Sequence, residues 1–347
     1  MRACIEMNTN DSSVRVAVVQ AAASLFNAEE SLAKAVEWIE SAAKQGAHLA
    51  LLPEAFIPGY PRGLSFGCTV GNRTDSGRDL WSRYWESAID IPGPELDVLR
   101  RAAEENSIHV AIGVVERGPQ QARATLYCTL VYIGPDGALL GIHRKLKPTG
   151  SERIIWGEGD GSTLTVIDTP LGRIGGLICW ENYMPLARMA LYRKGVQIYL
   201  APTADARPTW QSTLEHIACE GRCFVLGCNQ FVAEGLPIEQ IETGENIDHE
   251  LMKCRGGSSI VSPFGEVLAG PLYDQEGLLV ADLDMKDVVR GKLDFDVVGH
   301  YARPDVFQLE IDETRRVPDP LDSPDPNRTH NGEDQSVNEA VIHDEAT

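Results

Sequence analysis

Short apolar runs and helical apolar spacings divide most of the chain into strands and helices. An apolar run bounded by turn residues predicts a buried strand, and apolar residues three and four apart predict an amphipathic helix. Strands are predicted at residues 14–20, 48–53, 108–116, 124–133, 138–144, 164–167, 173–178, 197–201, 223–229, 258–262, 266–269 and 278–281. Helices are predicted at residues 28–44, 94–106, 185–194 and 208–221. Several neighbouring strands flank turn sequences such as Gly134-Pro135-Asp136-Gly137, which predicts hairpins.

Helix–strand units alternate with these hairpins along the chain. This order favours one domain with a large mixed sheet or two stacked sheets, and with helices outside. We expect residues 1–12 to be a flexible N-terminus and residues 13–311 to form the domain. Residues 312–347 are expected to be an acidic, disordered tail, because they are rich in Pro, Asp, Asn and Ser. The acidic, weakly patterned residues 234–248 are predicted to be a surface insertion.

Composition and charge narrow the range of partners. The chain has 347 residues and is 43% hydrophobic, which is enough for a large core. Its formal net charge is -20, and about seven of these negative charges follow residue 311, where ten acids accompany three arginines. Such a surface repels nucleic-acid backbones and anionic lipid headgroups, so we expect neither a nucleic-acid partner nor a membrane partner.

The cysteines indicate a reducing compartment. Eight are scattered along the chain, and the first dozen residues have no long apolar segment, so a cytoplasmic protein is expected. The spacing Cys219-x3-Cys223-x4-Cys228 resembles a metal-ligand spacing at first sight. It lacks a second ligand pair and the residues within it are apolar, which favours packing cysteines.

One cysteine ends the apolar run at residues 174–178. Cys179 is followed by Trp180-Glu181-Asn182, and a helical pattern begins at Pro185. A thiol between a strand and a helix is held rigidly within reach of a small ligand, and a thiolate is a strong nucleophile. Free cysteine is also among the most buried residue types. The segment Ile178-Cys179-Trp180-Glu181-Asn182 alone therefore leaves a catalytic and a structural cysteine equally open.

Two charged residues stand at the ends of other predicted strands. Glu54 follows the run at 48–53 and enters a Pro/Gly loop, where partial burial would raise its pKa toward the range of a general base. Lys145 follows the strand at 138–144, where an ammonium could stabilise a thiolate or an oxyanion. Taken singly, a solvated loop acid and a surface lysine are the commoner cases. No histidine has the sequence context of a cysteine protease, among His48, His109, His143 and His216.

The three strand ends together resemble the nitrilase (carbon-nitrogen hydrolase) superfamily, whose catalytic residues are Glu, Lys and Cys in that chain order. Further similar segments extend over roughly residues 14–310: Leu52-Pro53-Glu54-Ala55-Phe56, His143-Arg144-Lys145-Leu146-Lys147-Pro148-Thr149, Glu152-Arg153, Trp156-Gly157-Glu158-Gly159-Asp160-Gly161, Cys179-Trp180-Glu181-Asn182, Ala201-Pro202-Thr203-Ala204-Asp205 and Asp294-Phe295-Asp296. The Cys-Trp-Glu-Asn segment resembles the true nitrilase branch, since amidase branches usually carry another residue after the nucleophile.

The resemblance implies catalytic roles for Glu54, Lys145, Cys179 and Glu152. The Cys179 thiolate would attack a nitrile carbon, Glu54 would move protons and activate water, and Lys145 with a backbone N–H near Trp180 would stabilise the tetrahedral charge. Glu152 would position the lysine and the substrate. Some microbial members have a histidine shortly before that glutamate, where this chain has Gly150-Ser151. We expect this difference to affect substrate preference.

The resemblance also implies a fold, partners and a pocket. The fold is an α/β four-layer αββα sandwich, no metal or organic cofactor is needed, and the partners are a small nitrile, water and further copies of the chain, as a dimer that in some members builds spirals. Substrate-binding candidates are Tyr60, Trp180, Asn182, Tyr183, Thr203 and Trp210, each of which could equally be a packing residue. Of these, Tyr60 and Trp180 are favoured, and the aromatic side chains favour an apolar or aryl-bearing nitrile.

Other functions stay open at this stage. An amidase or an N-carbamoyl hydrolase would use the same three residues, and a cyanide-degrading enzyme is a narrower variant. A non-catalytic oligomeric scaffold would keep the fold without the chemistry. Intact Glu54, Lys145 and Cys179 argue against the scaffold.

Overall fold

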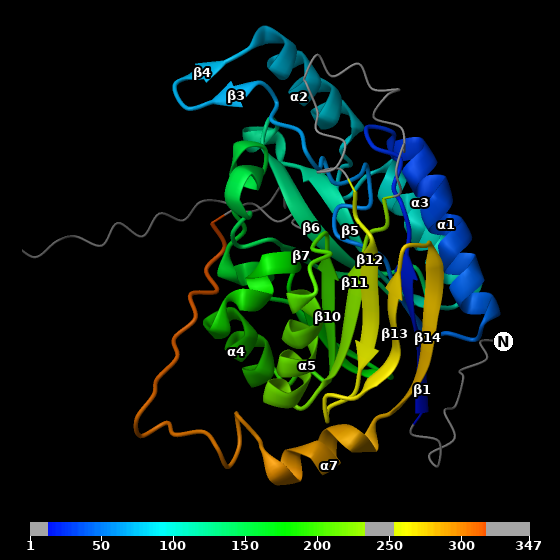
Figure 1. Ribbon diagram of the computed structural model, residues 1–347, viewed down its shortest axis with the longest axis vertical. Coiled ribbons are helices and arrows are strands. Elements are labelled where there is room, and N and C mark those ends of the chain that lie inside the picture. Colours follow the sequence, from blue (N-terminus) through cyan, green and yellow to red (C-terminus); the bar gives the residue numbers. More distant parts are fainter. Residues whose placement is uncertain (1–12, 233–252, 317–347) are drawn as a thin grey trace, which may run out of the picture.

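Two six-stranded sheets form the centre of the protein (Figure 1). The computed structural model describes residues 13–232 and 253–316; the predicted N-terminal segment 1–12, the predicted insertion 234–248 and residues 317–347 of the predicted tail lie outside them. The first sheet has the order β14 (Gly277–Asp284), β1 (Ser13–Gln20), β2 (Leu49–Leu51), β5 (His109–Arg117), β6 (Leu126–Ile133), β7 (Leu139–Arg144). The second has the order β13 (Val267–Tyr273), β12 (Gly256–Val261), β11 (Phe224–Asn229), β10 (Ile198–Thr203), β9 (Gly172–Gly176), β8 (Val166–Thr169).

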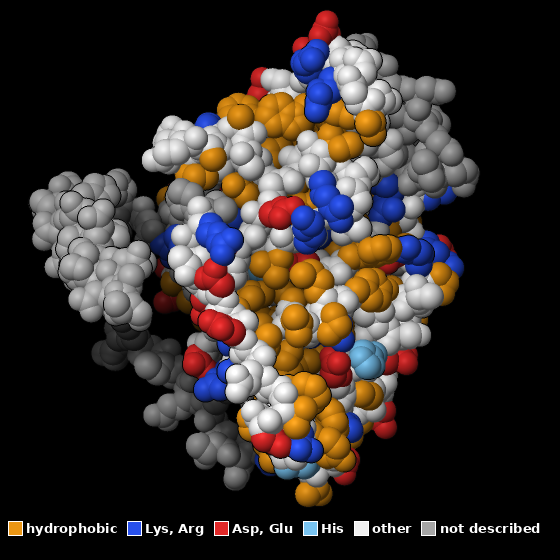
Figure 2. Space-filling view, turned by 90° about the vertical axis from the view of Figure 1, so that its left-hand side faces the viewer, with side chains coloured by type: hydrophobic (Ala, Val, Ile, Leu, Met, Phe, Trp, Pro, Cys, Tyr) orange, Lys and Arg blue, Asp and Glu red, His pale blue; other side chains and the backbone are white. Residues whose placement is uncertain are grey.

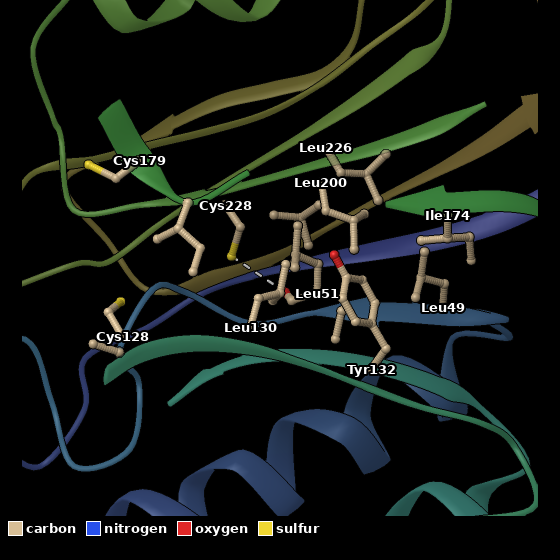
Figure 3. Close-up of a cluster of buried hydrophobic side chains, with 14 of the residues drawn as sticks. Leu49, Leu51, Cys128, Leu130, Tyr132, Ile174, Cys179, Leu200, Leu226 and Cys228 are labelled. Carbon is tan, nitrogen blue, oxygen red and sulfur yellow. Dashed lines mark hydrogen bonds between the residues drawn. The ribbon is translucent and has the colours of Figure 1, made fainter. Parts of the chain in front are cut away.

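Alternation along the strands places one face of each sheet against the other sheet. In β1, Val16 and Val18 belong to the apolar layer between the sheets, while Ala17 and Val19 belong to the layer beneath the helices. Side chains such as Leu130 and Leu200 fill the space between the sheets (Figure 3). Because both faces of these central strands are buried, the strands read as near-continuous apolar runs in the sequence.

Helices cover the outer face of each sheet. On the first sheet, α1 (Ala28–Lys44) and α3 (Pro94–Asn106) contribute Leu32, Ile39, Leu96 and Leu99 to a second apolar cluster. On the second sheet, α4 (Pro185–Arg193) and α5 (Thr209–Gly221) contribute Ala187, Leu191, Leu214 and Ile217 to a third cluster. The layers therefore run helix, sheet, sheet, helix, which confirms the αββα prediction.

Two helices were not predicted from the pattern. The segment of α2 (Asp75–Ser87) buries only Gly77, Leu80 and Tyr84, and that of α7 (Lys286–Asp294) buries only Val288 and Gly291. So few apolar residues leave a weak helical signal. The remaining elements are a small hairpin, β3 (Cys68–Thr69) and β4 (Asn72–Arg73), and the 3-10 turns η1 (Gln120–Ala122), η2 (Gly150–Ile154), η3 (Gly161–Thr163) and η4 (Cys179–Tyr183). Within residues 13–232 and 253–316, no helix has the length and apolar character needed to cross a membrane.

Candidate active site

The structure brings Glu54, Lys145, Glu152 and Cys179 together at one end of the sandwich. The first sheet supplies two of them: Glu54 follows β2, and Lys145 follows β7. Cys179 follows β9 of the second sheet and opens η4. The ammonium of Lys145 lies 2.7 Å from Oε1 of Glu54 and 2.7 Å from Oε2 of Glu152. The site is thus assembled across the gap between the two sheets.

Close backbone packing holds Glu54 in place. Gly113 of β5 lies directly against this segment, and a Cβ atom there would come within 2.6 Å of the Glu54 Cα. The Gly113 N–H donates to the carbonyl of Pro53, and the Gly113 carbonyl accepts from the N–H of Phe56. Only glycine permits so close an approach. Ala55 takes a left-handed conformation, with φ 47°, so the chain turns sharply just after the carboxylate.

Cys179 sits at a bend of its own. The ladder of β9 ends at Gly176, two residues earlier than the predicted strand, and Cys179 has φ 54°. A left-handed non-glycine residue is strained by about 1 kcal/mol or more, and such strain collects at functional sites. The hydroxyl of Thr203, the last residue of β10, donates to Sγ at 3.1 Å, and it accepts in turn from the N–H of Asp205. The thiol is therefore fixed from the neighbouring strand.

The buried carboxylate of Glu181 joins the cysteine turn to the lysine strand. It accepts from the N–H of Ile178 at 2.8 Å, just before Cys179, and from the N–H of Leu146 at 2.6 Å, just after Lys145. Nε2 of His143 lies 3.0 Å from the same carboxylate. The opposite nitrogen, Nδ1, donates to the carbonyl of Thr163 at 2.7 Å, and proximity to Glu181 raises the pKa of His143 despite burial. The Glu181 carboxylate thus holds the cysteine turn, the loop after Lys145 and the His143 ring together.

Burial and charge together set the protonation of the site. Burial raises the pKa of Glu54, and the neighbouring ammonium of Lys145 only partly opposes this. Burial works against the charge of Lys145, but the Glu54 carboxylate, the cysteine and Glu152 outweigh it and raise the pKa of the ammonium well above its usual value. Burial, followed by the Glu54 carboxylate, raises the pKa of Cys179. The resting site therefore holds a charged lysine and a neutral thiol beside a carboxylate that can accept its proton.

Glu152 connects this core to the cavity wall. It lies in η2, and its Oε2 accepts from the N–H of Thr149 at 2.6 Å as well as from Lys145. The phenol of Tyr60 donates to its Oε1 at 2.7 Å. Glu152 therefore has every oxygen occupied, as expected for a residue that positions the lysine.

A cavity of about 650 Å³ borders Cys179 and Glu152. Of the six predicted substrate-binding residues, Tyr60 and Trp180 line it, and Thr203 contacts the sulfur. Trp180 is fixed by a bond from its Nε1 to Asp205 at 2.8 Å and by the guanidinium of Arg207, 4.3 Å above the ring. A small electrophile in this cavity would meet the Cys179 thiol, with the buried Glu54 and Lys145 behind it.

The other three predicted pocket residues lie elsewhere. The amide of Asn182 is buried and donates to the carbonyls of Leu177 and Cys179, so it shapes the cysteine turn. Trp210 is buried in α5 among the third apolar cluster. Tyr183 packs on the Trp210 ring and borders a separate cavity between α4 and α5. None of the three is among the described residues that line the Cys179 cavity.

Several residues of the site carried no signal in the sequence analysis. Arg62 and Arg207 line the cavity from loops without periodicity, and Asp205, which also lines it, is the last residue of the family-like segment at 201–205. Cys128 lies on β6 with its Sγ 3.7 Å from Oε1 of Glu54. Only tertiary structure reveals this contact, because residues 54 and 128 lie in separate elements of the sheet.

Among the remaining cysteines of the described residues, Cys223, Cys228 and Cys254 are buried, and Cys68 and Cys219 are partly exposed. Cys223 and Cys228 are fully buried, and the Cys228 thiol donates to the carbonyl of Val19 at 3.1 Å. Every cysteine in the described part of the chain is a free thiol. In that same part, no three histidine, cysteine or carboxylate side chains gather in a way that could hold a metal ion.

Comparison with known proteins identifies relatives that cover most of the chain. The profile of the family described as Carbon-nitrogen hydrolase matches residues 15–292. A bifunctional nitrilase/nitrile hydratase of Nicotiana tabacum is 50% identical over 317 residues, which cover 90% of each chain. Nitrilase 3 of Arabidopsis thaliana is 49% identical over 315 residues, covering 88% of this chain and 89% of the relative. An aliphatic nitrilase of Sinorhizobium fredii is 50% identical over 299 residues, covering 86% of this chain and 96% of the relative.

Solved structures share the fold at lower sequence identity. Nit3 of Saccharomyces cerevisiae, a member of branch 10 of the nitrilase superfamily, superimposes with a TM-score of 0.67 at 22% identity, covering 84% of this chain and 97% of that chain. An amidase of Nesterenkonia sp. superimposes with a TM-score of 0.59, also at 22% identity, covering 79% of this chain and 92% of that chain. These likenesses bear on the architecture alone.

Proposed function

The chain belongs to the carbon-nitrogen hydrolase family, in its nitrilase branch, and from this premise we propose that it hydrolyses an organic nitrile to the carboxylic acid and ammonia. Residues 13–311 form its catalytic domain, and Glu54, Lys145, Cys179 and Glu152 carry the reaction. The observation that supports this most strongly is the Lys145 ammonium, 2.7 Å from both carboxylates, behind a thiol that borders a cavity.

The first half of the reaction forms a thioimidate. The thiol of Cys179 passes its proton to Glu54 while the sulfur attacks the nitrile carbon, and Glu54 returns the proton to the nitrogen. A raised pKa suits Glu54 to both directions of transfer. Lys145 and a backbone N–H near Trp180 stabilise the negative charge that develops on the substrate.

Two water molecules complete the reaction. Glu54 takes a proton from the first water molecule, and the oxygen of that water adds to the thioimidate carbon. The nitrogen is then protonated and leaves as ammonia, which gives a thioester. The second water adds in the same way, and the sulfur leaves, recovers a proton and releases the acid. One nitrile and two waters give one acid and one ammonia. Should the sulfur leave the first tetrahedral intermediate before ammonia does, the product is the amide.

A panel of aliphatic, aryl and arylaceto nitriles, each paired with its amide, tests this function. We expect ammonia and acid from at least one nitrile and little or none from the matching amide. The variant C179A should release no product while its circular dichroism and thermal unfolding match the wild type. Turnover of amides but not nitriles would instead indicate an amidase, and wild-type rates in C179A would refute the role of Cys179.

The amide is a second product to be measured in the same assays. The relative from Nicotiana tabacum is named for both nitrilase and nitrile hydratase activity, which supports a minor amide fraction here. Chromatography of acid and amide from one nitrile gives the ratio, and added amide that persists unchanged shows that the amide is a product rather than an intermediate.

We further propose that the chain forms a homo-oligomer built from dimers, in a reducing compartment such as the cytoplasm. Apolar side chains are exposed at the start of α4, with Leu186 68% exposed beside Tyr183 and Met184. Figure 2 views the side of the molecule on which α4 lies in Figure 1, and hydrophobic side chains gather across its middle. A contiguous apolar surface of this kind is typical of a subunit interface. The free thiols support the compartment.

A further inference from the structure

A second thiol, Cys128, contacts the Glu54 carboxylate of the site. Cys128 of β6 is fully buried, and its Sγ lies 3.7 Å from Oε1 of Glu54 in hydrogen-bonding geometry. Its backbone carbonyl accepts from the N–H of Lys145 at 2.8 Å. Cys128 and Cys179 lie at the same end of the apolar layer, on opposite sheets (Figure 3). Cys128 therefore contacts the Glu54 carboxylate with its thiol and the Lys145 backbone with its carbonyl, without being among the described residues that line the cavity.

We propose that Cys128 is a positioning residue for the reaction: its S–H donates to Oε1 of Glu54 and, together with Lys145, holds the carboxylate so that Oε2 is the oxygen that exchanges protons. The inference rests on the proposed function of Glu54 as the base. It gives a role to Cys128, which is not one of the four proposed catalytic residues.

The two oxygens of Glu54 have unequal surroundings. Oε1 accepts from Lys145 Nζ at 2.7 Å and from the Cys128 thiol. Oε2 is buried and has no hydrogen-bond partner within residues 13–232 and 253–316. An unpartnered buried carboxylate oxygen destabilises the fold, and such an exception calls for a functional reason. Two donors on Oε1 leave Oε2 as the proton acceptor.

The thiol of Cys128 remains a donor throughout the working range of pH. Burial and then the Glu54 carboxylate raise its pKa well above the ordinary value for cysteine. A protonated thiol can donate one hydrogen bond, and a bond to the ionised form of Glu54 favours that form. The other titratable groups that act on Glu54 come from several elements: Lys145 after β7, Glu152 in η2, Cys179 in η4, Tyr60 before α2 and Tyr84 in α2.

Three variants separate the donor from the side-chain volume. C128A removes the S–H, C128S replaces it with a stronger O–H donor, and C228A removes an equally buried thiol from the same apolar layer. The Cys228 thiol donates to Val19 rather than to a catalytic group, so C228A is the matched control.

We expect C128A to shift the acid limb of the kcat/KM pH profile to higher pH by roughly 0.5 to 1 pH unit. The same variant should lower kcat about 3- to 10-fold, with KM little changed. C128S should keep the limb at or below the wild-type position and recover most of kcat. C228A should lower thermal stability while leaving the pH profile in place. An unshifted limb in C128A, an upward shift in C128S, or an equal shift in C228A would overturn the proposal.

A second readout keeps the inference independent of turnover and of any one variant. Infrared titration of the Glu54 carboxyl band, with E54Q as the blank, should give a higher midpoint in C128A than in the wild type. If C128A does not fold, C128S still decides, since its midpoint must not exceed that of the wild type. Should the wild type hydrolyse no nitrile, the proposed function fails, and the infrared midpoints alone judge the contact between Cys128 and Glu54.

Discussion

Glu54, Lys145 and Cys179 hold their protons under opposing influences. Burial favours the uncharged form of each group, whereas the contacts between them favour ammonium and carboxylate. Burial, followed by the Glu54 carboxylate, thus favours a neutral thiol in the resting site. In the proposed reaction, a sulfur that starts as a thiol has to lose its proton as it attacks, so we expect the protonation state of Glu54 to control the first step.

The acid side of the pH profile should follow Glu54. The carboxylate is the active form, so activity is present above the raised pKa of the folded protein and is lost as the pH falls through it. The charge of Glu152 contributes to the raised pKa of Glu54, so E152Q should shift the acid limb of the kcat/KM pH profile to lower pH. The same variant should lower kcat by about 10- to 100-fold, because Lys145 loses one of its two carboxylates. Initial rates from pH 4 to pH 9 measure both effects, and an upward shift of the limb would contradict this account.

The sequence pattern drew attention to Glu54, Lys145 and Cys179 of the candidate site but not to the residues around them. Glu54, Lys145 and Cys179 each follow a buried strand, and the end of a buried strand is a position that local pattern reveals. Cys128 escaped notice because it lies within a strand, where a thiol is an ordinary packing residue. Asn182 and Trp210 were predicted to bind substrate because they lie in or near segments that resemble the family. Instead, the Asn182 side chain stabilises the cysteine turn and the Trp210 side chain packs in the core.

At the scale of elements, η4 and the end of β7 behave as one unit because Glu181 bonds to both. An amide at this position could accept only with its oxygen, and its NH₂ group would face an N–H donor. Each loop would then lose its fixed distance from the other. The nucleophile and the cation would separate even though neither had been changed.

The variant E181Q should therefore lower kcat about 10- to 100-fold with little change in KM. E116Q is the matched control, since Glu116 is equally buried and pairs with Arg144 and Thr129. Both variants should lose stability in chemical denaturation, but only E181Q should show the large loss of kcat. Equal losses of kcat in the two variants would reduce Glu181 to a general structural role.

Asp90 fastens the segment after α2 to the end of β5 and to the loop after η1. Burial opposes its ionisation, but hydrogen bonds from Arg123 and Arg117 outweigh burial and lower the pKa of Asp90 to about 2. A lowered pKa stabilises the fold above the unfolded-state pKa near 4, by on the order of 2 kcal/mol, and this is lost as the pH falls toward 2.

The variant D90N should accordingly lower the free energy of unfolding at pH 7 by roughly 1–2 kcal/mol, and by about half as much at pH 3. Urea titrations at the two pH values measure the difference. D97N, which breaks an exposed pair with Arg100, should change little at either pH. A D90N penalty that is the same at pH 7 and pH 3 would contradict the ionic origin.

At the scale of the whole molecule, the apolar pattern predicted sheets with helices outside but left one mixed sheet and two stacked sheets open, and the αββα layer order was implied by the family resemblance. Alternating burial along β1 and the apolar faces of α1 and α5 indicate sheets between helices. The helices α2 and α7 lie at the margins of the sandwich, where a few contacts suffice and the pattern is faint. Pairing between distant strands, such as β1 with β14, also leaves no local trace.

Association should depend on the exposed face of α4. The variant L186E places a charge on that face and should reduce the mass of the assembly in light scattering after gel filtration. V289E on α7 is the control, because Val289 is similarly exposed on another side, and its mass should match that of the wild type. An unchanged oligomer in L186E would move the interface elsewhere.

The acid and the lysine are mounted on one sheet, and the sulfur on the other. The hydrocarbon between them thus acts as a spacer that sets the width of the reaction gap. Protein interiors are nearly incompressible, so this spacer transmits small changes in thickness rather than absorbing them. A change in packing between the sheets would therefore alter the distance from the Cys179 sulfur to Glu54 and Lys145. A change too small to unfold the protein would first be seen as a lower turnover rate.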